Sequence, residues 1–121
     1  MSWGFVYIME SAAFPGMFKV GYTERSPMGR AEELSRSTAT PLPLTVICYA
    51  EFSNAKEAEK RIHKALSHKR VSECREFFWG PFSEIYEIVM DRDYARVLCE
   101  HHAAVAFWEE EHPALIEFVG I

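Results

Sequence analysis

The chain has 121 residues, 49% hydrophobic and 26% charged, which fits one globular domain rather than a disordered chain. No apolar run approaches the roughly 20 residues that a membrane-spanning helix needs, and the N-terminus lacks the features of an export signal. The cysteines are odd in number and widely spaced, which favours reduced thiols over a disulfide framework or a zinc site. We therefore expect a cytoplasmic protein without a membrane partner.

The net charge of −5 is unevenly distributed along the chain. Residues 19–75 contain eleven lysines and arginines against seven aspartates and glutamates, a net charge of +4, and the rest of the chain carries −9. Contacts to phosphates dominate nucleic-acid affinity, so a basic segment of this kind indicates a nucleic-acid partner.

The first elements are two strand-like runs, at residues 3–9 and 17–23, separated by a proline–glycine turn signal that predicts a hairpin. The second run holds Lys19 among apolar residues, where an ammonium group is costly unless it reaches water, a carboxylate or a ligand. Tyr7 lies in the facing strand, so we expect its hydroxyl near Lys19. On these residues alone, an amphipathic hairpin with a snorkelling lysine explains the pattern equally well.

The apolar periodicity then predicts a third strand and several helices. Ser26 followed by Pro27 is typical of a helix start, and Ser53 or Asn54 is expected to cap a later helix. We therefore predict an α/β (α+β) fold, with a small three-stranded antiparallel sheet flanked by helices and an added C-terminal helix. Its expected parts are a domain at residues 1–90, an extension at 91–121 packed on it, a strand at 44–52, and helices at 27–36, 54–67, 82–90 and 92–110.

Three polar residues stand out on the predicted helices. Arg30 lies on the edge of an apolar stripe, and Glu59 lies at the border of another, with His63 one turn later on the same side. Taken alone, Arg30 could be a surface ion pair, and Glu59 a boundary residue paired with His63 or a lysine. Tyr7 could likewise be an ordinary core aromatic.

Several short motifs occur in a fixed order along the first three quarters of the chain. Together they resemble the GIY-YIG nuclease domain, in the phage and bacterial branch that has a lysine where the family name has a tyrosine. The resemblance covers residues 3 to about 90. The motifs are Gly4-x-Val6-Tyr7-Ile8, Lys19-Val20-Gly21-x-Thr23, Arg30, Glu59 and Arg75-Glu76-Phe77-Phe78.

The resemblance implies a metal-dependent endonuclease that hydrolyses phosphodiester bonds, of DNA in preference to RNA. It implies that Glu59 binds a single Mg²⁺ or Mn²⁺, an ion that often takes only one or two protein carboxylates. It implies that Tyr7 activates the attacking water. A phenol needs nearby cations to lower its pKa for this role, and Lys19 is the expected neighbour. Arg30 would stabilise the phosphate as it gains charge.

Some roles stay open in the sequence. Many family members carry a histidine four residues after the arginine, where this chain has Leu34, so His63 could fill that catalytic role. Glu76 could contact the metal, or only Arg30 or a neighbouring arginine. Gly21 is expected to let substrate or a neighbouring strand come close. The expected nucleic-acid contacts are Lys19, Arg25, Arg30, Lys60, Lys64 and Arg75, and the expected structural positions are Gly4, Gly21, Thr23 and Glu76.

Two other functions fit the same fold, because fold alone does not give activity. One is a module that binds nucleic acid without cutting it, and the other is a protein-interaction domain with a lapsed site. The apolar tail after Pro113 could pack on the domain or on a second copy of the chain, so a homodimer through this tail is a further expectation.

Overall fold

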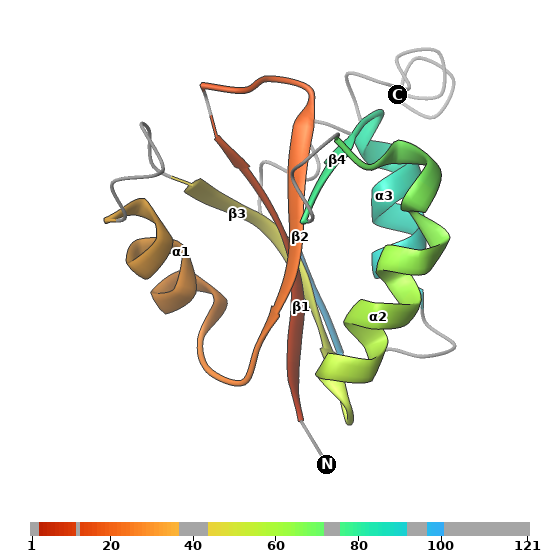
Figure 1. The fold of residues 1–121 in the computed structure, drawn as a ribbon. Coiled ribbons are helices and arrows are strands. Elements are labelled where there is room, and N and C mark those ends of the chain that lie inside the picture. Colours follow the sequence, from red (N-terminus) through yellow and green to blue (C-terminus); the bar gives the residue numbers. More distant parts are fainter. Residues whose placement is uncertain (1–2, 12, 37–43, 72–75, 92–96, 101–121) are drawn as a thin grey trace, which may run out of the picture.

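The structure is a computed structural model, and it describes residues 3–11, 13–36, 44–71, 76–91 and 97–100 (Figure 1). Five antiparallel strands form one sheet in the order β4-β2-β1-β3-β5. The strands are β1 (Gly4–Ser11), β2 (Met17–Thr23), β3 (Leu44–Phe52), β4 (Phe77–Trp79) and β5 (Val97–Glu100).

The three predicted strands and their antiparallel pairing are confirmed, and β1 lies in the middle of the sheet. The prediction of only three strands is wrong, because short strands extend the sheet at both edges. β4 has three residues, which is too short to give a recognisable alternation of apolar and polar side chains.

The predicted helix at residues 92–110 is also wrong for the part of it that the structure describes. Residues 97–100 form β5, which pairs with β3 from Cys48↔Glu100 to Glu51↔Val97. A run of four residues fits either a helical or an extended pattern, and here the open edge of β3 selects the extended one. The rest of that predicted helix and the apolar tail lie outside the described residues.

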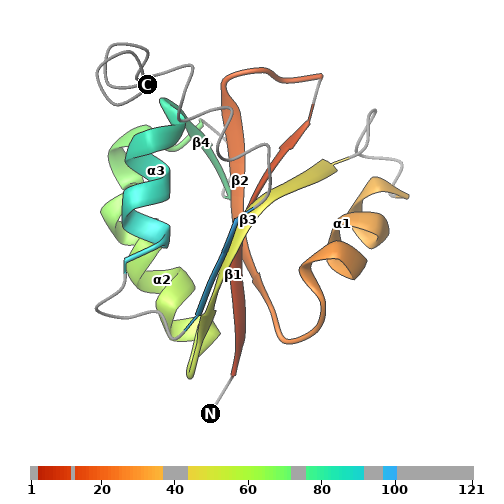
Figure 2. The same ribbon diagram turned by 180° about the vertical axis from the view of Figure 1, so that it is seen from behind.

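Helices cover both faces of the sheet. Figures 1 and 2 show α1 (Pro27–Ser35) on one face, and α2 (Ala55–Ala65) and α3 (Phe82–Val89) together on the other. Ser26 and Asn54 cap the first two helices, since their side-chain oxygens accept bonds from Gly29 N and Glu57 N, both at 3.3 Å. No helix in these described segments is long and apolar enough to cross a membrane.

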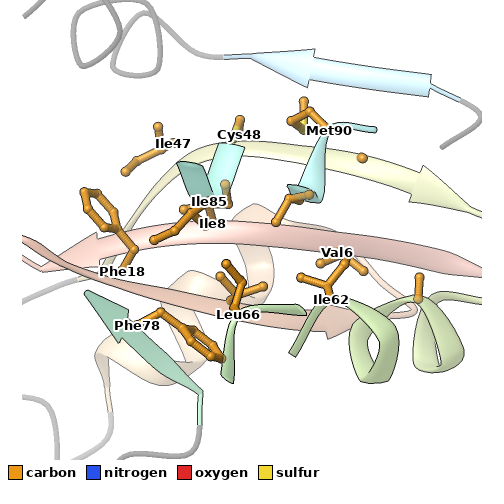
Figure 3. Packing of buried hydrophobic residues seen from close by; sticks show 14 of the residues in the cluster. Val6, Ile8, Phe18, Ile47, Cys48, Ile62, Leu66, Phe78, Ile85 and Met90 are labelled. Atoms are coloured by element: carbon orange, nitrogen blue, oxygen red, sulfur yellow. The ribbon is translucent and has the colours of Figure 1, made fainter. Parts of the chain in front are cut away.

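The main core lies between the sheet and the two helices α2 and α3 (Figure 3). It contains even-numbered residues of β1 and β2, such as Val6 and Phe18, packed on Ile62 and Ile85 from the helices. The short helix η1 (Ser67–Lys69) follows directly after the buried Leu66 at the end of α2.

A second, smaller core lies between the sheet and α1, where Tyr7 and Met9 of β1 meet Ala31 of the helix. A register shift between Ile8 and Met9 inserts one extra residue into β3 at this point, which is a β-bulge. As a result, Ile47 and Cys48 both join the main core, and the earlier residues Leu44 and Val46 face α1.

Ile62 tests how much the main core contributes to stability. Its side chain is completely buried between α2 and the sheet, so Ile62→Ala should lower the free energy of unfolding by about 2–5 kcal/mol. Met28 is the control, because it is 40% exposed and Met28→Ala should change that energy by no more than about 0.5 kcal/mol. Urea unfolding of the two variants measures both values, and similar losses would contradict the placement of Ile62.

Candidate active site

An open cleft of about 650 Å³ lies where β2 ends and α1 begins. Four carboxylates and two guanidinium groups line it, so the cleft has an excess of negative charge. The lining consists of Tyr7, residues 22–26, Gly29, Arg30, Glu33, Glu59 and Glu76. The structure therefore brings together Tyr7, Arg30 and Glu59 from three separate elements.

The cleft lies beside an edge of β2 that no strand covers among the described residues. β4 pairs only with Met17 to Lys19, so the second half of β2 has backbone groups to satisfy. Side chains of α2 satisfy two of them. The backbone N–H of Tyr22 donates to the Glu59 carboxylate, and His63 Nε2 lies 2.7 Å from the Val20 carbonyl oxygen.

Tyr7 occupies space that only a glycine opposite could provide. Tyr7 and Gly21 are cross-strand partners, and a Cβ atom at position 21 would lie 2.5 Å from the Tyr7 hydroxyl oxygen. Gly21 thus admits the side chain of the neighbouring strand, which is one of the two expectations for it. A similar constraint holds at Gly4, where a Cβ atom would collide with the Thr23 carbonyl oxygen.

The Tyr7 hydroxyl accepts a hydrogen bond from the Arg30 guanidinium. Arg30 Nη1 also lies 3.2 Å from Glu33 Oε2, one turn further along α1. Arg30 therefore bridges the phenol and a carboxylate of its own helix. Glu33 was missed in the sequence, although its position three residues after Arg30 is a recognisable signal for such a pair.

The predicted lowering of the Tyr7 pKa is wrong for this structure. Burial of the phenol raises its pKa to about 12, and the negative charges of Glu76 and Glu59 add to that rise. Arg30 lowers the Tyr7 pKa, but by less than burial raises it. Lys19 lies opposite Met9 in the sheet, and the charged groups that shift the Tyr7 pKa are Glu76, Arg30 and Glu59.

Lys19 instead forms an ion pair with Glu76. Its side chain is 8% exposed, and its ammonium lies 5.5 Å from the centre of the Phe77 ring. The Val20 N–H donates to the Glu76 carbonyl oxygen at 2.9 Å, which holds Glu76 beside β2. A carboxylate is thus the partner that this buried lysine needed, and neither the ammonium nor His63 lines the cleft.

Glu59 is half-buried, and burial raises the pKa of its carboxyl, with a further rise from Glu76. His63, the Tyr22 N–H and Lys19 oppose this rise. A carbonyl oxygen can only accept a hydrogen bond, so His63 Nε2 must carry a proton and donate to Val20. The His63 ring packs at 5.1 Å from Phe78, which fixes its orientation.

The other predicted residues are spread around the cleft. Arg25 lines it with a side chain that is 85% exposed, whereas Lys60 and Lys64 are exposed on α2. Leu34, which replaces the family's histidine, packs against the small core beside Tyr7. Arg75 lies outside the described residues.

The carboxylates of the cleft fit a hard divalent cation. Within the described segments, no group of three or more histidines, cysteines, aspartates and glutamates could hold a metal ion. Mg²⁺ nevertheless takes as few as one or two carboxylates together with water. Glu59 and Glu76 line the same cleft. The charge of Glu76 raises the pKa of Glu59, and both carboxylates raise the pKa of Tyr7, so a cation bound beside them would relieve an existing repulsion.

Gly21→Ala tests the packing of Tyr7. The added methyl group must displace the phenol, so we expect a loss of about 1–3 kcal/mol in the free energy of unfolding. Gly29 is a matched control in the same cleft, because a Cβ atom there would meet only Ser26 at 3.7 Å. Gly29→Ala should raise stability by about 0.5–1 kcal/mol, as is usual inside a helix. Equal effects in urea unfolding would contradict the proposed crowding at Gly21.

The fold and the cleft define an α+β module with a tyrosine, two arginines and four glutamates at its open sheet edge. The T5orf172 domain matches residues 4–91, and the chain belongs to this family of nuclease-associated domains. Comparisons with curated proteins and with solved structures found no match.

Proposed function

We propose that the protein is a metal-dependent endonuclease of the GIY-YIG type, which hydrolyses phosphodiester bonds of nucleic acid, DNA in preference to RNA. One observation carries the proposal. Tyr7 and Arg30 are hydrogen-bonded to each other in a cleft that Glu59 and Glu76 also line. A base, a phosphate-binding cation and anchors for Mg²⁺ or Mn²⁺ are the parts that this hydrolysis requires.

Glu59 is the residue that would hold the metal, with Glu76 as a second oxygen ligand. The Glu59 carboxylate is oriented by the Tyr22 N–H, and the Glu76 carboxylate by its ion pair with Lys19. When bound, the ion would compensate these charges and stabilise the charge that develops on the phosphoryl oxygens.

Tyr7 would accept the proton of the attacking water. Arg30 already occupies one acceptor direction of the phenolic oxygen, and its positive charge favours the phenolate. The water oxygen then forms a bond to phosphorus as the bond to the leaving oxygen breaks. The cleft is open, so solvent can supply the proton that the leaving oxygen takes.

Arg30 would bind the scissile phosphate and align it with Tyr7, because a planar guanidinium offers several donors in a fixed geometry. Its bond to Glu33 leaves further N–H groups for a phosphate. Arg25 stands on the rim with its side chain largely exposed and would attract the neighbouring phosphates.

Glu59→Gln removes the charge of the proposed metal anchor and keeps its shape. Cleavage of plasmid DNA with Mg²⁺ or Mn²⁺ should fall by about 100-fold or more. The pKa of Glu59 is raised, so its ionised form destabilises the folded protein at pH values above the carboxyl's ordinary range. The metal-free variant should therefore unfold at a higher temperature than the wild type, and added Mg²⁺ should no longer raise that temperature.

Arg30→Ala is the control for this experiment. It should also abolish cleavage, but the stabilisation by Mg²⁺ should remain, because Arg30 is not a proposed ligand. If Glu59→Gln retains full activity beside an inactive Arg30→Ala, the metal assignment to Glu59 is wrong and Glu76 becomes the anchor. If neither the wild type nor any variant cuts DNA or structured RNA, the domain is a binding module.

The pH dependence of cleavage tests Tyr7 as the base. A phenol with a pKa of about 12 is protonated at neutral pH, so its active form grows as pH rises. The single-turnover rate should increase about tenfold per pH unit above neutrality, until it levels off at the metal-bound pKa of Tyr7. A rate that levels off at pH 6–7, the region where a histidine titrates, would point to His63 instead.

A further inference from the structure

Glu33 is a charged residue in the cleft for which the proposed reaction has no role. Its side chain, on α1, is 48% exposed and lines the cleft together with Arg25 and Arg30. A negative charge at this point opposes the binding of nucleic acid, because it repels phosphates and partly neutralises the two arginines. Its presence beside both proposed phosphate-binding residues therefore calls for an explanation.

The Glu33 carboxylate lies between the two arginines and presents a different oxygen to each. Its Oε2 lies 3.2 Å from Nη1 of Arg30, and its Oε1 lies 3.9 Å from Nη1 of Arg25. Arg30 is on α1, whereas Arg25 precedes that helix. The free oxygens of a phosphodiester can face two guanidinium groups in the same way. In this structure, Glu33 thus supplies the negative charge that a phosphate would otherwise provide.

The two contacts of Glu33 differ in strength. The contact to Arg30 is a hydrogen bond between residues about one turn apart on the same helix. The contact to Arg25 is too long for a hydrogen bond, and the Arg25 side chain is 85% exposed. A phosphate that enters the cleft can therefore draw Arg25 away at little cost, whereas Arg30 keeps its carboxylate partner.

The bond to Glu33 also directs Arg30 toward Tyr7. An arginine on a helix surface otherwise has many side-chain conformations. The Arg30 guanidinium donates to the Glu33 carboxylate and to the Tyr7 hydroxyl, and two acceptors in fixed places restrict it to one orientation. Such placement matters for catalysis, because a displacement of about 1 Å can slow a reaction by about 100-fold.

From these contacts we propose that Glu33 is a positioning residue, which occupies the place of a substrate phosphate between Arg25 and Arg30. From that place it holds Arg30 against Tyr7. This inference rests on the proposed function and adds a residue to it. Glu33 lowers the affinity for nucleic acid and raises the rate of cleavage, so its removal changes the two quantities in opposite directions. A residue that only stabilised α1 would change both in the same direction.

Binding of a labelled DNA duplex by the full chain, without divalent metal, measures the first effect. Glu33→Gln and Glu33→Ala both remove the charge. Each should bind about 5-fold more tightly than the wild type, as two exposed ion pairs of ordinary strength allow when they no longer compete with phosphates. The affinity should also fall more steeply with salt, since more arginine charge is available to release counterions.

Glu32 provides the matched control on the same helix. It pairs with Arg36 at 3.9 Å and does not line the cleft. Glu32→Gln and Glu32→Ala change the net charge of the protein by the same amount as the Glu33 variants, so they account for any general gain in attraction to DNA. They should bind less than about 2-fold more tightly than the wild type, because exposed charges away from the site are screened.

Single-turnover cleavage of the duplex with Mg²⁺, at saturating protein, measures the second effect. Glu33→Ala leaves Arg30 without its carboxylate partner and should cut about 10- to 100-fold more slowly than the wild type. Glu33→Gln keeps an oxygen that can accept from Arg30, so it should recover much of that rate. The Glu32 variants should cut at the wild-type rate. Tighter binding together with slower cleavage identifies a positioning role.

Equal binding by the Glu33 and Glu32 variants would overturn the proposal, and so would a decrease of both binding and rate in Glu33→Ala. If the wild type cuts and Glu33→Ala cuts equally fast, the role of Glu33 fails and the nuclease proposal stands. If the wild type cuts nothing and the Glu33 variants still bind more tightly than the Glu32 variants, the nuclease proposal fails, whereas the place of Glu33 between the arginines stands.

Discussion

The uncovered half of the β2 edge is the constraint on which the candidate site depends. A strand edge must satisfy its outward backbone groups, and here α2 does so with side chains rather than another strand. Glu59 accepts from the Tyr22 N–H and His63 donates to the Val20 carbonyl. Because no strand occupies this edge in the described part of the chain, residues from both faces of the sheet meet in one cleft.

The negative charge of the cleft is only partly neutralised by the lysines and arginines around it. Lys19 is buried and neutralises Glu76, whereas Glu59 has no lysine or arginine at salt-bridge distance among the described residues. The raised pKa values of Tyr7 and Glu59 are the consequence of this incomplete compensation together with burial. The cleft therefore carries an unfavourable electrostatic energy, which a bound cation or its hydrated complex with phosphate would lower. Functional sites often carry such a cost in stability.

Much of the fold could be predicted from the sequence, because long periodic runs and capping residues act locally. The three central strands, the hairpin and the helix starts at Ser26 and Asn54 belong to this group. The two edge strands could not be predicted, since each is short and depends on a partner distant in sequence. The candidate site could likewise be predicted only in part, because some of its contacts join residues that are distant in sequence. Arg30 and Glu59 were found from motifs, but the partner of Lys19 lies 57 residues away, and the Gly21–Tyr7 contact requires the strand register.

The bulge in β3 determines which face each of its residues occupies. One additional residue at Ile47 lets Leu44 and Val46 support Tyr7 from beneath α1, while Cys48 and Ala50 remain in the main core. Side chains alternate with a period of two, so losing that residue would exchange the two faces for the whole first half of the strand. The number of residues in β3 is therefore more tightly constrained by the fold than their identity. An insertion or deletion in β3 would remove the support of the tyrosine even if every motif residue were retained.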